Sequence, residues 1–170
     1  MHVSIKWTNT RSDKVVNSHI EDTLSGDALD RSKVTLGDNG LYRSADNTIV
    51  WDKNSTTNLV SILPGESNSV SFSMASILNS TQLRAIKNPH INLHVVMTGD
   101  RSGIETGEVT SSQDVIIKIS SDVTLSAKSY RGVGPLTNSG PIPPRADHET
   151  TYTIAWSMTN TTNNLKDTVV

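Results

Sequence analysis

The chain has no cysteine among its 170 residues, which excludes disulfide bonds, cysteine-ligated metal sites and thiol catalysis. Charged residues are scarce at 19%, the net charge is -2, and lysine and arginine are scattered along the chain. A nucleic-acid-binding protein needs a basic stripe to neutralise phosphates, so we expect no nucleic-acid partner.

Long apolar runs are also missing. No run approaches the roughly 20 residues that a membrane-spanning helix requires, so we expect no span in this chain. The first residues lack the basic and apolar regions of a signal peptide, and any secretion signal is expected to lie outside the chain.

The short motifs of enzymes are missing as well. The sequence has no Gly-x-Ser-x-Gly motif, no glycine loop suited to phosphate and no acid–base cluster. We therefore expect no enzyme activity and no cofactor, and we assign no catalytic, cofactor-binding or metal-binding residue.

Strand patterns are what the sequence does contain. Val3, Ile5 and Trp7 alternate with polar residues, as in a strand with one buried face. One short helical segment is expected over 76–87. The chain is otherwise rich in serine, threonine and asparagine, with turn signals between short strands, which predicts an all-β sandwich. Further strands are expected at 34–36, 48–51, 59–63, 70–74, 91–96, 109–119 and 123–127.

The end of the chain resembles its beginning. Ser-Ile-Lys-Trp-Thr-Asn-Thr at 4–10 returns as Thr-Ile-Ala-Trp-Ser-Met-Thr-Asn-Thr at 153–161, so that Trp156 corresponds to Trp7 and Asn160 to Asn9. Self-similarity at a fixed offset, here about 150 residues, is typical of repeat proteins. The sequence therefore predicts one repeat cut out of phase, followed by the start of the next.

The position of the repeat in the chain predicts how the chain divides into domains. Residues 1–120 are expected to form a β-sandwich that lacks its first strand, and residues 121–170 to hold a proline- and glycine-rich segment and the first strands of the following repeat. That segment, 131–148, contains four of the six prolines. It is either a domain linker or a long loop within the next module.

Several segments carry a family likeness. Gly-Pro-Ile-Pro-Pro at 140–144, the strand at 149–163 and the stretch from Leu24 to Gly65 resemble the tandem immunoglobulin-like, DUF11-type repeats of bacterial and archaeal cell-surface proteins, most closely those of small candidate-phylum bacteria. The resemblance implies an immunoglobulin-like sandwich and a structural or adhesive role, and it transfers no catalytic residue.

We therefore expect a structural module of a repetitive extracellular or cell-surface protein, such as a stalk, a surface layer or a filament. Copies of the chain or neighbouring repeats, joined head to tail, are the expected partners, with assembly by strand exchange as one route. The alternative is an adhesin or carbohydrate-binding module that contacts surface glycans or a host-cell surface.

The histidine and acidic residues fit ordinary structural roles. His90 and His94 lie about 13 Å apart on one strand face, too far to share an ion, and are expected to be exposed. The acidic residues at 21–22 and at Asp27 and Asp30 are expected in solvated loops rather than in a calcium site.

The tryptophans, two lysines and several asparagines are candidates for core packing, sugar binding or covalent modification. Trp7 and Trp156 are expected to anchor cores, whereas Trp51 is left between a core position and an exposed sugar-stacking site. Lys6 and Lys118 are candidates for an isopeptide bond by position alone. Asparagine acceptor motifs for glycosylation begin at Asn54, Asn79 and Asn160.

Overall fold

The computed structural model describes residues 1–77, 85–103, 106–120, 122–132, 134–167 and 169. Within these residues the protein is all-β, and its one helical turn is the 3-10 helix η1 (Thr57–Leu59). The predicted all-β sandwich class is confirmed. Most of the helical segment expected over 76–87 lies outside the described residues.

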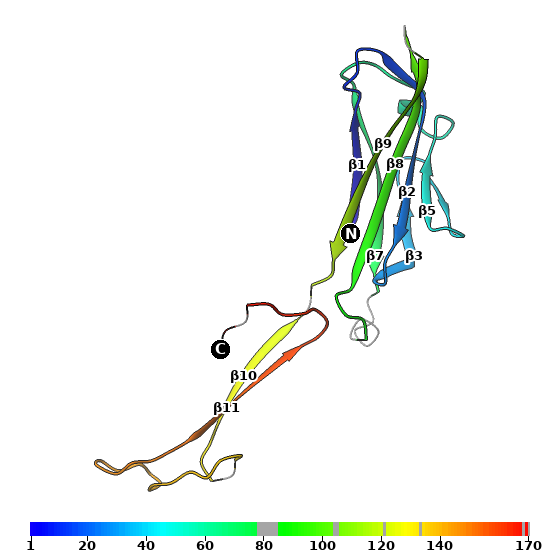
Figure 1. Cartoon of the computed structure of the whole chain (residues 1–170). Coiled ribbons are helices and arrows are strands. Elements are labelled where there is room, and N and C mark those ends of the chain that lie inside the picture. The colour runs from blue at the N-terminus through cyan, green and yellow to red at the C-terminus, as the bar shows by residue number, and fades with distance from the viewer. Residues whose placement is uncertain (78–84, 104–105, 121, 133, 168, 170) are drawn as a thin grey trace. The chain divides into compact units, whose positions relative to one another are not determined.

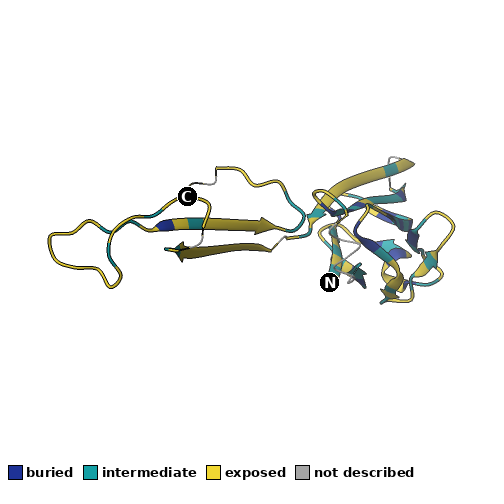
Figure 2. Cartoon of the chain, turned by 90° about the horizontal axis from the view of Figure 1, so that it is seen from below, coloured by how far each residue is buried: buried dark blue, intermediate teal, exposed yellow. Residues whose placement is uncertain are grey.

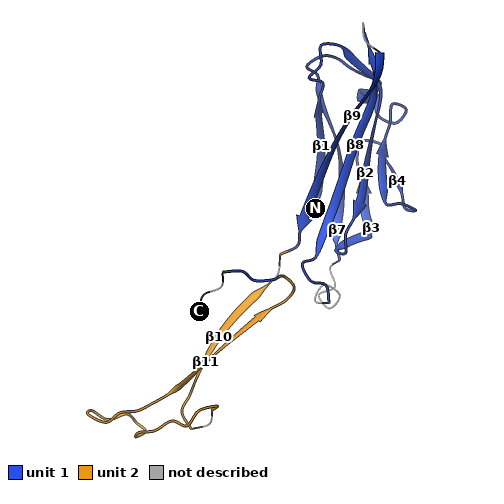
Figure 3. Cartoon of the chain, in the orientation of Figure 1, with its two compact units in different colours: residues 1–119, 164–170 blue, residues 120–163 orange. Residues whose placement is uncertain are grey.

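The chain divides into two compact units (Figure 3). Unit 1 comprises residues 1–119 and 164–170, and unit 2 comprises residues 120–163.

Unit 1 contains two antiparallel sheets (Figure 1). The first has the order β1-β7-β3, with β1 (His2–Thr8), β7 (Ser67–Ser76) and β3 (Leu29–Leu36). The second has the order β4-β5-β2-β8-β9. Its strands are β4 (Leu41–Arg43), β5 (Thr48–Trp51), β2 (Lys14–Ser25), β8 (His90–Ser102) and β9 (Thr106–Lys118), and β6 (Ser61–Ile62) pairs with the start of β2.

The hydrophobic core lies between these sheets, because its buried members come from both. Trp51 is its largest residue and is 0% exposed. Its ring centroid lies 6.1 Å from that of Phe72 in the opposite sheet, and its indole Nε1 donates a hydrogen bond to the Gly37 carbonyl at 3.2 Å. Trp51 is thus a core anchor, and the alternative of an exposed sugar-stacking position is wrong.

Two segments differ from the strands expected from the sequence. The strand expected over 59–63 is the end of η1 followed by the two-residue β6. The central strand β2 was not expected, because a bulge breaks its alternation: the register with β8 shifts between Val16 and His19, and Asn17 has φ +51°.

Unit 2 is built on an antiparallel pair, β10 (Val123–Tyr130) and β11 (Thr153–Asn160), in which Ala127 lies opposite Trp156. The proline- and glycine-rich segment connects these two strands and is therefore a loop inside unit 2. The Asn138 amide closes this loop by donating to the carbonyls of Tyr130 and Arg131, at 3.2 and 3.3 Å, and by accepting from the Thr153 hydroxyl at 3.1 Å.

One face of the β10–β11 pair is apolar and uncovered. Opposite residues of an antiparallel pair share a face, so the register gathers five apolar side chains on one side. All five are exposed: Val123, Leu125, Ile154, Trp156 and Met158. In Figure 2 the two strands of unit 2 are mostly yellow, the colour of exposed residues. Two strands alone are marginally stable in water, because nothing covers such a face.

Candidate functional site

One side of the unit 1 sandwich is open, between the edge strands β1 and β9. Val3, Ile5 and Trp7 of β1 face the core and pack against it, yet each is only half-buried. Val115 of β9 lies opposite the buried Leu93 and so faces the core, but it is 42% exposed. We call these two uncovered flanks the open side of the sandwich.

The side chains of β9 that face the core change from apolar to polar along the strand. Ile117 and Val115 are apolar, but Gln113 and Ser111 continue the same row and are exposed. A row that faces a core and remains exposed lacks a covering element. The polar residues at 111 and 113 are the sequence signal for this opening, which the alternation of the strand alone does not predict.

The backbone of β1 has free hydrogen-bonding groups along its outer edge. Met74 N donates to the Met1 carbonyl and Asn9 N donates to the Glu66 carbonyl, both at 2.9 Å, so the odd-numbered residues of β1 bond to β7. The even-numbered residues point to the other edge: His2, Ser4, Lys6 and Thr8. Among the described residues, no strand pairs with that edge.

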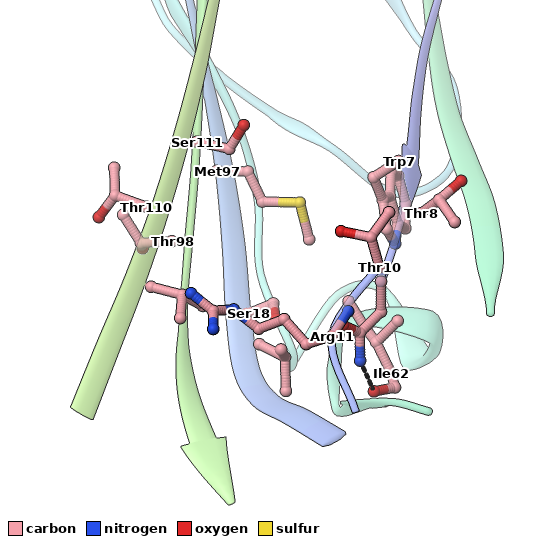
Figure 4. Close-up of a pocket in the computed structure, with 13 residues that line it drawn as sticks. Trp7, Thr8, Thr10, Arg11, Ser18, Ile62, Met97, Thr98, Thr110 and Ser111 are labelled. Atoms are coloured by element: carbon pink, nitrogen blue, oxygen red, sulfur yellow. Dashed lines mark hydrogen bonds between the residues drawn. The ribbon is translucent and has the colours of Figure 1, made fainter. Parts of the chain in front are cut away.

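A hollow of about 210 Å³ lies at the end of the open side. Figure 4 shows Trp7 on one side of the hollow and Met97 and Thr110 on the other. Its lining comes from the end of β1, the loop after it and the first part of β9, with further residues from β2, β6 and β8. The hollow therefore marks where the end of β1 lies beside the beginning of β9.

Two buried polar atoms at the hollow lack partners among the described residues. They are the indole Nε1 of Trp7 and the hydroxyl of Ser18, and both residues line the hollow. A buried donor without a partner is costly, so these groups favour an occupant that offers an acceptor.

Asp22 is a buried carboxyl in the core of unit 1. It lies on β2 between Ile20 and Leu24, is 0% exposed, and neither carboxyl oxygen has a partner among the described residues. Burial raises the pKa of Asp22 to about 6, against an opposing effect of His94. The expectation that Asp22 lies in a solvated loop is wrong.

The other acidic and histidine candidates make local contacts. Asp27 accepts a hydrogen bond from the backbone N–H of His90 at 3.0 Å, and Asp30 accepts from the Ser32 hydroxyl at 2.7 Å. His94 Nδ1 lies 2.6 Å from an oxygen of Asp114. His90 and His94 both have partly exposed side chains and separate partners, so the structure does not bring them together.

The remaining candidates are mostly on the surface. Trp156 is 59% exposed, so the expectation that it anchors a core is wrong for this chain. Lys6 and Lys118 are exposed, as are the acceptor asparagines Asn54 and Asn160. Asn79, the third acceptor, lies outside the described residues.

Neither a metal site, a membrane-spanning helix nor a known relative accompanies this geometry in the part of the chain that the structure describes. Among the described residues, no group of three or more histidine, aspartate or glutamate side chains is arranged to hold a metal ion. In the same part of the chain, no helix has the length and apolar character of a membrane span. Comparisons with protein-family models, with curated proteins and with solved structures find no match. The open side and its hollow are thus the candidate site, and the site offers the unpaired backbone edge of β1.

Proposed function

We propose that this protein is a non-catalytic structural module of a repetitive extracellular or cell-surface protein, such as a stalk, surface layer or filament. The observation that carries the proposal is the recurrence of one strand in both units. β1 and β11 carry the corresponding residues Trp7 and Trp156, and each lies in an antiparallel pairing.

The correspondence extends to the turn that follows each strand. The Asn9 amide donates to the Asp13 carbonyl at 2.9 Å, four residues on, and Asn160 donates to the carbonyl of Asn163, three residues on. A repeated strand with a repeated turn supports an array of modules, and arrays of modules serve to span distance. The strand order of unit 1 also suits an immunoglobulin-like sandwich.

The alternative function is an adhesin or carbohydrate-binding module. Its aromatic candidate, Trp51, is not available for stacking on a sugar, because the side chain is fully buried. We therefore place the structural role first.

Labelling of intact cells tests the structural role. An antibody raised against the purified chain is applied to the cells that produce it, before and after permeabilisation, and sequencing of the flanking coding region shows whether copies recur about every 150 residues. We expect surface labelling of intact cells and recurring copies. Labelling only after permeabilisation, with no further copy, would contradict the proposal.

A further inference from the structure

We infer that β1 of one chain accepts β10 of a second copy, so that strand exchange closes the open side of the sandwich. This inference deepens the proposed structural role and rests on it. Unit 2 provides the template, because β11 corresponds to β1 and already holds β10 as its antiparallel partner.

The hydrogen-bonding pattern supports the pairing. Thr161 N donates to the Asp122 carbonyl at 3.2 Å, so the odd-numbered residues of β11 bond to the even-numbered residues of β10. Aligning Trp156 with Trp7 converts Ser157 and Ala155 of β11 into Thr8 and Lys6 of β1. These are residues whose backbone groups are free on β1, so the same donors and acceptors of β10 fit both strands.

The template also fixes the register. Ala127, which lies opposite Trp156 in unit 2, lies opposite Trp7 in the exchanged pair. Ser126 then faces Thr8, and Lys128 faces Lys6. Opposite residues share a face, so the apolar side chains of β10 turn toward the core, next to Trp7.

Only one edge of β10 can both bond to the free backbone groups of β1 and turn its apolar side chains toward the core. Its other edge presents the backbone groups of odd-numbered residues, which would have to face even-numbered residues of β1. That pairing would put Leu125 and Ala127 on the solvent side of the sheet. β10 must therefore leave β11 to pair with β1, and the association is an exchange rather than a simple addition.

Burial of apolar surface drives the exchange. Leu125 is 51% exposed and Val123 is 49% exposed in unit 2. Beside β1, Leu125 lies two residues beyond Ala127 on the same face, next to the hollow lined by Trp7 and Met97. The exchange therefore moves the apolar side chains of β10 from a bare face to a covered position and also covers Val115 across the opening, while β11 gives up its pairing with β10.

The chain cannot make this pairing with its own β1. Ser111 of β9 lies at the hollow beside the end of β1, and Lys118 lies seven residues farther along β9, about 23 Å away at roughly 3.3 Å per residue. In this register Val123 belongs beyond the end of β1. The five steps from Lys118 to Val123 span at most about 18 Å, so the donor must be a second copy.

Cysteine cross-linking tests the register, and the chain offers no native thiol to interfere. One preparation carries Thr8→Cys and another carries Ser126→Cys, both at exposed positions. Directly opposite residues have Cα atoms about 5.5 Å apart, within the range for a disulfide. Mixing the two full-length chains under mild oxidation should give a mixed dimer as the main product.

The matched control pairs Thr8→Cys with Tyr130→Cys, four residues farther along β10 and about 13 Å out of register. Equal yields from the two mixtures would overturn the inference. So would an intrachain disulfide in a chain that carries both Thr8→Cys and Ser126→Cys, because it would show that β10 folds back onto its own β1. A chain that remains monomeric by light scattering and yields no mixed dimer would overturn it as well.

Charge reversal supplies a second, independent test. The register places Lys6 opposite Lys128, and like charges that face each other oppose pairing. Lys6→Glu or Lys128→Glu should each tighten self-association about two- to fivefold at low salt, and combining them should restore the weaker wild-type value. Lys33→Glu on the far strand β3 is the control.

If Lys6→Glu and Lys128→Glu behave like Lys33→Glu in sedimentation experiments, the pairing is wrong. Such a result would leave surface labelling of intact cells unaffected, so failure of the exchange and failure of the structural role are distinguishable.

Discussion

Two strands with similar sequences, β1 and β11, lie in different environments. β1 has the paired strand β7 beside it and a second sheet across from it, so Val3, Ile5 and Trp7 pack against a core. β11 has β10 beside it and a bare face, so Ile154 and Trp156 are 62% and 59% exposed.

The difference shows that an alternating pattern specifies a face and not its burial. Both strands separate polar from apolar side chains equally well, but burial requires an opposing sheet. Unit 1 has that second sheet, and the described part of unit 2 has only the β10–β11 pair. The bare face of unit 2 and the open side of unit 1 are therefore complementary features.

The largest test of this comparison is a tryptophan series. Trp51→Ala should lower the free energy of unfolding of unit 1 by about 3–5 kcal/mol, because it empties the centre of the core. Trp7→Ala should cost about 2 kcal/mol, since Trp7 is half-buried, and Trp156→Ala should change unit 1 by less than about 0.5 kcal/mol. Denaturant titration of each variant measures the three values.

The order within the series is the informative result. A loss for Trp156→Ala as large as that for Trp7→Ala would show that the face of β11 is covered in solution. The comparison between the two strands would then fail.

The strands of unit 1 were largely predictable where alternation is regular. Val70, Phe72 and Met74 of β7 alternate with serine and alanine, and all three are buried as expected. The repeated Trp and Asn positions predict a correspondence between β1 and β11 from the sequence alone, and both segments are strands.

The candidate site was less predictable, for two physical reasons. In β2 the bulge at Asn17 shifts the period, and the core-facing row contains the polar residues Ser18 and Asp22, so the strand looks like a polar loop. The burial of Trp51 depends on Phe72, 21 positions along the chain, and local pattern carries no information about that contact.

The second test uses pH, because Asp22 of unit 1 is a buried carboxyl. The pKa of Asp22 is raised from 3.8 to about 6 in the folded state, so folding favours its protonated form. The contribution of Asp22 to the free energy of unfolding is fully present below pH 3.8 and is lost as the pH rises through 6. The loss amounts to about 3 kcal/mol. Asp22→Asn should therefore match the wild type near pH 4 and exceed it by up to about 3 kcal/mol at pH 7.

Denaturant titrations at pH 4, 5 and 7 give this difference directly. Asp122→Asn, the same substitution at an exposed position in unit 2, is the control. The carboxyls of Asp30 and Asp52 have lowered pKa values because of local hydrogen bonds, so they act below pH 4 and outside this window. A constant difference between Asp22→Asn and wild type would mean that the carboxyl is solvated.

The smallest test compares the two turn asparagines. The side chain of Asn9 is buried, donates to the carbonyls of Asp13 and Ile62 at 2.9 and 3.0 Å, and accepts from the Arg11 N–H at 3.0 Å. Asn9→Ala leaves these backbone groups without partners, so it should lower the free energy of unfolding by about 1–2 kcal/mol. Asn160 is exposed, and Asn160→Ala should cost less than about 0.5 kcal/mol.

A charged substitution separates hydrogen bonding from packing at the same position. Asn9→Asp keeps the acceptor for Arg11 N–H and nearly the same volume, but it turns a carboxylate oxygen toward the carbonyls of Asp13 and Ile62. If the two donated bonds matter, Asn9→Asp should be less stable than Asn9→Ala at pH 7 and should recover on acidification, because a protonated carboxyl can donate once. If Asn9→Asp is instead as stable as wild type in denaturant titrations at pH 7, the turn does not depend on those bonds, and the resemblance between the two turns has no energetic meaning.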